Sequence, residues 1–436
     1  MSGTTVRNPR RALAIVFAVV FVDLLGFGIL IPIIPLYAEH FGATEFVAGL
    51  LVAAYSITQF VFAPLLGRVS DERGRRPVLL LSLAGSVLAW TLFGLAGALW
   101  TLFLARFVAG AMGGNIAAAQ AYIADVTTEE NRAKGLGLVG AAFGLGFVFG
   151  PAIGAVASSA PALAIARSVL PAAVPVTEFT LPSFVAAAVT GLNFLAALAV
   201  LPETREPGTT AGRPDESRLA RLRSALADPT LGGLVVSFFL FSLAFSGMES
   251  MFVLFTYDRF GYGPTMNGYV LSYLGVVVAV VQGGLVGRVT ERYGEQRVAL
   301  VGVALVSATL FALPFTPQLG AYLPAAGPLW GALPRVSPGL VALLAVLSVL
   351  AVGDGFANVA MTTLVSKSAP VDEQGGAFGL TQSAGGLARA LGPGIAGWLY
   401  TVLFYWSPFV VGGALTAVIL YVLVVSFRPA AEPSPL

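Results

Sequence analysis

The sequence contains no cysteine, a single histidine (His40) and little charge. Without cysteine it can form neither disulfides nor thiolate-bound metal clusters. It also lacks a histidine pair and a serine–lysine arrangement within a helix, so an enzyme is not indicated. A phosphate loop of the GxxxxGK[ST] type is missing too, which argues against ATP as the energy source. We therefore expect no metal or other cofactor, and neither nucleotide nor nucleic acid as a partner.

What the sequence has is long apolar runs: 57% of the 436 residues are hydrophobic and only 11% are charged. A hydrocarbon core about 30 Å thick needs roughly 20 apolar residues per helical crossing. Continuous runs, rather than alternating ten-residue segments, argue against an outer-membrane barrel. The pattern predicts an all-α membrane protein with twelve transmembrane helices, at about 12–37, 46–67, 77–96, 99–124, 135–158, 183–201, 229–256, 266–287, 298–316, 338–365, 376–403 and 405–427.

The orientation follows from where the 24 lysines and arginines lie. Most of them fall on one side of this map, including the stretches 68–76 and 205–223. Cytoplasmic loops carry such an excess. We therefore expect both termini in the cytoplasm and a multi-pass protein of the plasma (inner) membrane.

The longest polar interval, 202–228, divides six predicted helices from six. We expect an N-terminal bundle over 1–201, a cytoplasmic linker over 202–228 and a C-terminal bundle over 229–436. The leucines of SRLARLRSAL (217–226) recur at helical spacing and favour a short helix on the inner leaflet. A basic flank that only stops translocation explains the same residues.

Two repeats relate the halves. LLGRVSDERGRRPVLLL (65–81) is echoed 220 residues later by LVGRVTERYGEQRVALV (285–301), and each follows the second helix of its half. FGLGFVFGPAIGA from Phe143 is echoed by GGLARALGPGIAG from Gly385, at an offset of 242. Parallel six-helix repeats with a substrate site between them are a secondary-transporter architecture.

These stretches resemble the major facilitator superfamily and, more narrowly, its drug:H⁺ antiporter branch with tetracycline-type and multidrug exporters. GRVSDERGRRP is similar to the signature loop between helices two and three, and RFVAGAMGG from Arg106 to the helix-four arginine motif. DLLGFGILIPIIP from Asp23 matches the first helix of tetracycline exporters. One departure is Ala89, where those exporters carry a carboxylate. The resemblance implies two pseudo-symmetric six-helix bundles and drug export.

Five ionisable residues fall inside predicted helices: Asp23, Arg106, Glu249, Asp354 and Arg389. A charge at a helix centre costs about 2.5 to 3.5 kcal/mol on the insertion scale, so each needs pairing or a function. We expect proton coupling from the first four. Arg106 would pair with a carboxylate, Asp23 first, in a proton-dependent way; a static ion pair that fixes helix packing is the alternative.

Polar and aromatic residues on the same helices are candidates for a substrate cavity. Phe238, Ser242 and Phe245 precede Glu249 on one helix face, an apolar wall with one acid that would suit a lipophilic cation. Interhelical hydrogen bonds or, for Arg389, a structural ion pair are the alternatives. The candidate cavity residues are Gln59, Gln120, Phe238, Ser242, Phe245, Asn358, Gln382 and Arg389.

Two further motifs complete the expected machinery. Gly67 and Gly74 would permit a tight turn between helices two and three, with Asp71 accepting hydrogen bonds from a neighbouring helix N-terminus. The resemblance implies that this loop latches a cytoplasmic gate; arginines that merely set orientation are the alternative. The gate residues are Gly67, Arg68, Asp71, Gly74 and Arg75, and the antiporter-type motif of helix five has Gly146, Gly150, Pro151 and Gly154.

Together these features favour a proton-coupled secondary transporter that exports lipophilic, drug-like solutes by alternating access, as a monomer. Its partners would be the solute, protons and the lipid bilayer. A proton-linked or facilitative importer of a sugar or other metabolite keeps the same fold. A membrane receptor or scaffold built on a transporter fold is an alternative of another class.

Overall fold

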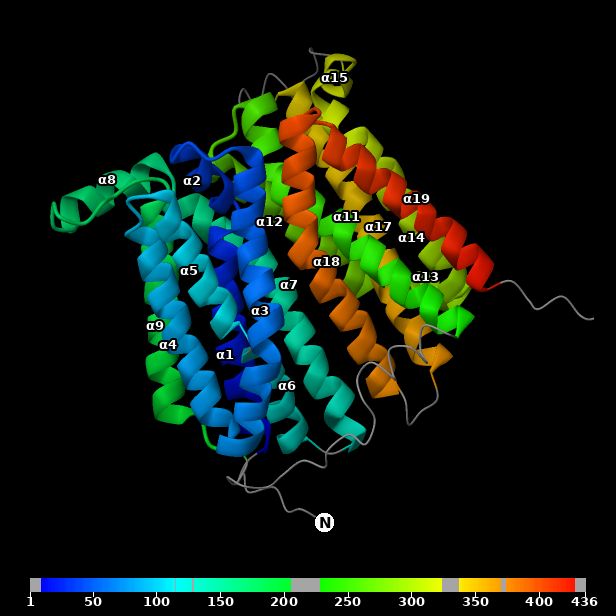
Figure 1. The fold of residues 1–436 in the computed structure, drawn as a ribbon, viewed down its shortest axis with the longest axis horizontal. Coiled ribbons are helices and arrows are strands. Elements are labelled where there is room, and N and C mark those ends of the chain that lie inside the picture. The colour runs from blue at the N-terminus through cyan, green and yellow to red at the C-terminus, as the bar shows by residue number, and fades with distance from the viewer. Residues whose placement is uncertain are drawn as a thin grey trace, which may run out of the picture. The chain divides into compact units, whose positions relative to one another are not determined.

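The computed structural model describes residues 9–113, 115–127, 129–204, 228–323, 337–369 and 374–427. The regular structure of these ranges is helical (Figure 1). The linker helix expected at 217–226 lies outside the described residues. The all-α prediction is therefore confirmed wherever the chain is described.

The first half of the chain supplies nine helices among the described residues. Thr44 accepts a hydrogen bond from the Val47 amide and so caps the third of them. Their bounds are α1 (Pro9–Leu30), α2 (Ile34–His40), α3 (Glu45–Arg73), α4 (Arg75–Gly94), α5 (Leu99–Met112), α6 (Asn115–Val126), α7 (Glu129–Ala157), α8 (Ala160–Val169) and α9 (Thr180–Val200).

The second half follows the same pattern. Ser337 caps the long helix that begins at Pro338, accepting from the Leu340 amide at 3.1 Å. The elements are α11 (Pro229–Phe260), α12 (Pro264–Val280), a π-helical turn (Val281–Leu285), α13 (Val286–Tyr293), α14 (Glu295–Ala312), a 3₁₀ turn (Leu313–Phe315), α15 (Thr316–Ala321), α17 (Pro338–Ser368), α18 (Gln374–Val402) and α19 (Ser407–Ser426).

Ten helical segments of the described chain are long and apolar enough to cross a membrane. The other two expected crossings correspond to α18 and to α5 with α6. The predicted helix 99–124 is broken, because α5 ends at Met112 and Gly113 follows as its C-cap. The predicted helix 12–37 divides into α1 and α2, and 266–287 contains the π-helical turn. Breaks of this kind change no residue's hydrophobicity, so periodicity does not reveal them.

Contacts group the chain into two compact units. Unit 1 comprises Met1–Arg213, Glu249–Ala279 and Pro393–Leu403. Unit 2 comprises Pro214–Met248, Val280–Gly392 and Phe404–Leu436. The division of the chain at 202–228 stays a prediction, and this grouping differs from it by placing parts of α11, α12 and α18 with the first-half helices.

The core of each unit is built by helices in close contact. In unit 1, α1 packs against α7 and α9, α4 against α5 and α9, and α3 against α5. Val16, Leu79, Leu83 and Tyr122 are fully buried in this core. In unit 2, α14 contacts both α17 and α19. Apolar side chains on the other faces remain exposed, as expected of helices that face lipid.

Candidate functional site

Arg106 is the largest fully buried side chain of the described residues, with 1% of its surface exposed. It lies on α5, and its guanidinium carbon is 4.7 Å from the centroid of the Tyr55 ring on α3 and 5.9 Å from that of Phe27 on α1. Such cation–π contacts gain strength where water is excluded. Three helices of unit 1 thus enclose one charge.

Hydrogen bonding satisfies this guanidinium only in part. Nε and Nη2 of Arg106 donate to the backbone oxygens of Leu51 and Val52, each at 3.4 Å. Nη1 is buried and has no hydrogen-bond partner among the described residues. A buried donor left unbonded costs about 1 to 3 kcal/mol, more when it is charged. A side chain kept at that cost in a membrane helix is by default a functional candidate.

The surroundings of Arg106 differ from the expected ones. No ion pair between Arg106 and Asp23 is present, although both residues are described; Asp23 is half-buried on α1 and has contacts of its own. The predicted helix 99–124, which carries both Arg106 and Gln120, is interrupted at Gly113, and Gln120 is exposed on α6. The direct Arg106–Asp23 pair is therefore absent from this conformation.

Gln59 does lie beside the Arg106 cluster. Its Nε2 donates to the backbone oxygen of Gly113 at 2.9 Å and to the Tyr55 hydroxyl at 3.2 Å. Gly110 lets α5 approach α3 closely, because a Cβ there would meet the Tyr55 backbone oxygen. Tyr55 is not among the residues expected from the sequence, since an aromatic residue in an apolar helix carries no signal of its own.

Asp354, another of the ionisable residues expected within the membrane helices, is also buried. It lies on α17 with 9% of its surface exposed, among Gly353, Gly355 and Phe356, and no hydrogen bond or ion pair of its carboxylate is found within the described chain. Asn358, one turn further on, is exposed. Of these two candidates, only Asp354 is therefore buried.

Two expected cavity residues of unit 2 are brought together at Gly385 of α18. A Cβ at Gly385 would lie 3.2 Å from the Ser242 hydroxyl of α11 and 3.3 Å from Nη1 of Arg389. Phe238 and Phe245 are half-buried on the same helix as Ser242, and Gln382 is exposed. Arg389 is exposed and has contacts of its own. Glu249, on the part of α11 that belongs to unit 1, is half-buried and also has contacts.

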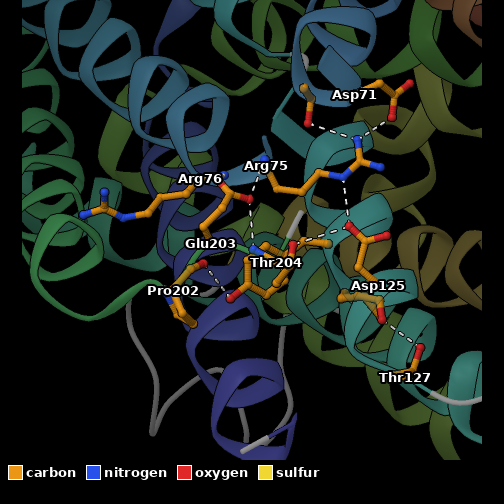
Figure 2. Close-up of polar contacts among 11 residues, drawn as sticks. Asp71, Arg75, Arg76, Asp125, Thr127, Pro202, Glu203 and Thr204 are labelled. Carbon is orange, nitrogen blue, oxygen red and sulfur yellow. Dashed lines mark hydrogen bonds and ion pairs between the residues drawn. The ribbon is translucent and has the colours of Figure 1, made fainter. Parts of the chain in front are cut away.

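The expected gate loop carries a network of ion pairs in unit 1 (Figure 2). Arg75 is 5% exposed, and its guanidinium donates to Asp71 at 2.7 Å, to Asp125 on α6 at 3.0 Å and to the Ser70 hydroxyl at 3.2 Å. Arg68 is exposed. Arg75 therefore ties the end of α3 and the start of α4 to α6.

Two details of the expected turn need correction. Gly67 makes no turn, because α3 continues through it to Arg73, and only Gly74, with φ 99°, separates the helices. Asp71 does not accept from the N-terminus of α4. Glu203 does so instead, accepting from the amides of Arg75 at 2.8 Å and Arg76 at 3.1 Å.

The chain just after α9 is anchored to the same network (Figure 2). Glu203 also accepts from the Thr204 amide at 2.9 Å, and the Thr204 hydroxyl lies 3.4 Å from Asp125. The Tyr122 hydroxyl donates to the Pro202 backbone oxygen at 3.1 Å. Asp125 and Glu203 are functional candidates that the sequence does not reveal. In the sequence, both are acids at the ends of apolar runs. That position gives no indication that they contact the start of α4.

The antiporter-type motif forms a close helix contact. Along α7, a Cβ at Gly146 would lie 3.0 Å from the Leu24 Cβ, and one at Gly150 would lie 2.6 Å from the Gly28 Cα. At Gly154 it would meet the Ile29 backbone oxygen. Pro151 lies within the helix. These glycines therefore let α7 pack closely against α1.

Unit 1 contains a further polar cluster that the sequence does not predict. The Tyr400 hydroxyl donates to Asp258 at 2.5 Å, and the Thr401 hydroxyl donates to Glu45 at 2.9 Å while accepting from the Phe46 amide at 3.0 Å. A cavity of about 50 Å³ is lined by residues that include Glu39, Glu45 and Asp258. Sequence order hides this cluster, because Glu45 and Thr401 are 356 residues apart.

Comparison with known proteins gives a consistent result. The family described as the Major Facilitator Superfamily matches residues 16–330 and 319–436. The Escherichia coli tetracycline resistance protein of class E is 35% identical over 313 residues, which is 71% of this chain and 73% of that protein. The class C protein of Escherichia coli is 30% identical over 427 residues, covering 95% and 96%.

Solved structures agree with this match. The human organic anion transporter MFSD10 has 25% identity and a TM-score of 0.61, covering 96% of this chain and 100% of that one. The nucleoside transporter NupG has a TM-score of 0.72 at 13% identity, over 96% of this chain and 100% of that one, and shows the fold alone. These findings confirm a multi-pass membrane transporter rather than an enzyme. The chain belongs to the major facilitator superfamily, and its relatives include tetracycline resistance proteins.

Proposed function

We propose that this protein is a proton-coupled exporter of lipophilic, drug-like solutes that works by alternating access. The observation that carries the proposal is Arg106, a fully buried guanidinium in a membrane helix whose Nη1 has no hydrogen-bond partner among the described residues. Such a group responds strongly to any charge that appears or disappears nearby, because the surrounding medium screens it little. Binding or release of a proton by a neighbouring carboxylate is an event of this kind.

Asp354 supports the same proposal from unit 2. A carboxylate buried in a membrane helix, with no ion partner in the described chain, is a typical element of a proton pathway. Asp23 and Glu249 remain further candidates for coupling. The network around Arg75 is the proposed cytoplasmic gate, with both termini on its side of the plasma (inner) membrane.

The energy available to such an exporter is sufficient. One charge crossing 100 mV releases about 2.3 kcal/mol, and one pH unit adds about 1.36 kcal/mol. At about 1.4 kcal/mol per tenfold change, one proton can hold a few-hundred-fold gradient of a neutral solute.

The solute class is the finer part of the proposal. The class C tetracycline resistance protein matches nearly the whole chain, which supports drug export. Ala89 on α4 is the departure noted above, because the resemblance implies a carboxylate at that place. The likeness to a structure described as an organic anion transporter, together with the unbonded Arg106 Nη1, favours an amphiphilic anion as a second candidate. A free guanidinium N–H is a donor that a carboxylate or enolate can accept from.

The test uses purified protein in vesicles that contain a pH indicator. Tetracycline, a lipophilic cationic dye and an amphiphilic organic anion are each offered, with and without an imposed pH gradient. We expect solute movement in one direction to be matched by proton movement in the other. Uptake of a sugar or other metabolite without drug-driven proton flux would instead support an importer. The absence of any solute or proton flux would support a receptor or scaffold.

Variants separate coupling from binding. Asp354→Asn is expected to abolish proton movement while solute binding persists, and Arg106→Ala to abolish transport against a gradient. Glu178→Gln, which changes an exposed carboxylate, is the matched control and should transport normally. Normal coupled transport by Arg106→Ala and Asp354→Asn would contradict the proposed mechanism.

A further inference from the structure

Helix α8 (Ala160–Val169) is an apolar helix without a buried residue. Its sequence, APALAIARSV, contains one charged residue, Arg167. Ile165 is 65% exposed and Val169 75% exposed, far more than a protein core would allow. The segment that follows, LPAAVPV, is also apolar and largely exposed. An apolar surface of this kind marks a contact with a partner or a membrane.

The length of α8 restricts what that partner is. Ten residues rise only about 15 Å, half of what a helix needs to span the hydrocarbon core. Apolar helices of such a length are buried core helices, re-entrant segments or interfacial segments. Because no residue of α8 is buried, the first of these is excluded.

The faces of α8 favour an interfacial position. Ala162, Ile165, Ala166 and Val169 follow the spacing i, i+3, i+4, i+7, which puts them on one face of a helix. At roughly 100° per residue, Arg167 and Ser168 lie about 150° and 110° from the centre of that face. The helix therefore has one apolar face and places these two polar side chains away from it.

The position of α8 in unit 1 puts this apolar face at the edge of the bilayer. The helix begins three residues after the membrane-spanning part of α7 ends at Ala157, and α9 enters the membrane at Thr180. Figure 1 shows α8 extending sideways from the ends of the neighbouring spanning helices α5 and α9, crosswise to them. Trp100 at the start of α5 is 66% exposed, and tryptophan is enriched at membrane interfaces.

Arg167 connects α8 to the segment that follows it by two hydrogen bonds. Its Nε and Nη2 donate to the Val176 backbone oxygen at 3.3 and 3.1 Å. The guanidinium thus closes the loop between α8 and α9 on the polar side of the helix. Its charge stays near the headgroups while the aliphatic part of its chain covers apolar surface.

We propose that α8 is an interfacial anchor that lies in the membrane surface opposite the 68–76 loop, with Ile165 and Val169 inserted among the lipid chains. The lipid surface is the occupant because α8 directly connects two membrane-spanning helices, α7 and α9, at the ends of their spans. The anchor would fix the connection between α7 and α9 at a constant depth. This inference does not depend on which solute is transported or on proton coupling.

The absence of cysteine makes the test direct, because every introduced cysteine is a unique labelling site. Ile165→Cys and Ser168→Cys receive a nitroxide label in full-length protein in phosphatidylcholine–phosphatidylglycerol vesicles. Leu192→Cys, on an exposed apolar position of α9, is the lipid reference, and Glu178→Cys, on the exposed loop, is the water reference. Collision rates with oxygen and with a water-soluble nickel chelate then report depth.

We expect the Ile165 label to collide readily with oxygen, as Leu192 does, at a depth of about 5 to 10 Å below the headgroups. Its collision rate with nickel should be about threefold or more below that of Glu178, and the Ser168 label should lie shallower. Nickel accessibility at Ile165 equal to that at Glu178 would overturn the proposal in favour of a water-exposed helix. Protection from both reagents would overturn it in favour of a protein partner, such as a second copy of the chain.

Discussion

Arg75 and Glu295 occupy equivalent positions in the two repeats, 220 residues apart, yet they carry opposite charges. Each follows the glycine that separates two helices, and both glycines adopt positive φ, 99° at Gly74 and 81° at Gly294. Only glycine adopts such φ values without steric cost. The repeat therefore preserves the backbone of the turn while the side chains around it have changed.

The ion pairs show the same exchange. Arg75 pairs with Asp125 at 3.0 Å, whereas Glu295 pairs with Lys367 at 2.6 Å. Lys367 lies 242 residues after Asp125, which is the offset of the second repeat. Each unit thus joins the helix after its turn to an equivalent later segment, with the charges reversed.

The ion pairs Arg75–Asp125 and Lys367–Glu295 differ in how far their basic side chains are buried. The Arg75 side chain is 6% exposed and has three side-chain partners, whereas the Lys367 side chain is 62% exposed and has one within the described chain. The counterpart of Asp71 is Glu291, an exposed acid four residues before another acid, so no local pair forms. The comparison indicates that the first turn is the fixed structural element and that the second is free to change its contacts.

Arg75→Ala is expected to have the largest effect. It removes the cation that joins the carboxylates of Asp71 and Asp125, and breaking a buried pair costs about 3 to 5 kcal/mol. Because these carboxylates are 42% and 26% exposed, we expect about 3 kcal/mol of destabilisation. Thermal unfolding of the purified protein in detergent measures it.

Exchanging the charges sharpens this prediction. Arg75→Glu combined with Asp125→Lys gives the first unit the arrangement of the second. The introduced glutamate would be repelled by the acids Asp71 and Glu203. The double variant should therefore recover less than half of the stability that Arg75→Ala loses. Full recovery would show that the network of Figure 2 adds nothing to a single pair.

Gly150→Ala tests the second repeat. Its Cβ would lie 2.6 Å from the Gly28 Cα, so the backbones of α1 and α7 must separate. Overpacking of this kind costs about 1 to 3 kcal/mol, and we expect about 2. Circular dichroism melting in detergent is a suitable measurement.

Two glycines provide the comparison for Gly150. A Cβ at Gly392, its counterpart at the offset of 242, would meet the Ser246 hydroxyl, which can rotate away, and the Leu243 backbone oxygen at 2.9 Å. Because a Cβ at Gly150 would meet two backbone atoms closer than that, Gly392→Ala should cost less than Gly150→Ala. Gly144→Ala is the control, because no atom lies within 4 Å of the added carbon. Equal losses at Gly150 and Gly144 would contradict a seam between α7 and α1.

Glu203→Gln is expected to cost about 1 kcal/mol. The carboxylate accepts from the first amides of α4, where a negative charge is favoured by about 0.3 to 1 kcal/mol. The amide of glutamine retains an acceptor but loses the charge. Glu72→Gln, at an exposed acid on α3, is the control, and an equal shift in melting temperature for both variants would remove the capping role.

The fold could be predicted because its signals are local. Runs of about 20 apolar residues define the crossings, and the glycine of each repeat defines the turn between them. Asp354 and Arg106 could be singled out because a charge in an apolar run is conspicuous. Gly150 could be singled out as part of a motif, because small residues at four-residue spacing are conspicuous and are typical of close helix contacts.

The partners of these residues could not be predicted, because a partner depends on distances that only the folded chain fixes. Arg106 faces Tyr55 and Phe27 instead of Asp23. Glu203, rather than Asp71, caps α4, since its position after α9 brings it to that helix start. Tyr400 and Asp258 meet only after helices 142 residues apart have come together.

Lys367→Ala is expected to have the smallest effect. An exposed ion pair contributes about 0 to 1 kcal/mol, because water and salt screen it and two long side chains lose freedom. We expect about 0.5 kcal/mol or less, vanishing at about 1 M salt, where charges are screened within about 3 Å. Exchanging the two residues, Glu295→Lys with Lys367→Glu, should leave the melting temperature unchanged, in contrast to the exchange at Arg75 and Asp125. A loss as large as that of Arg75→Ala would mean that burial does not distinguish the two turns.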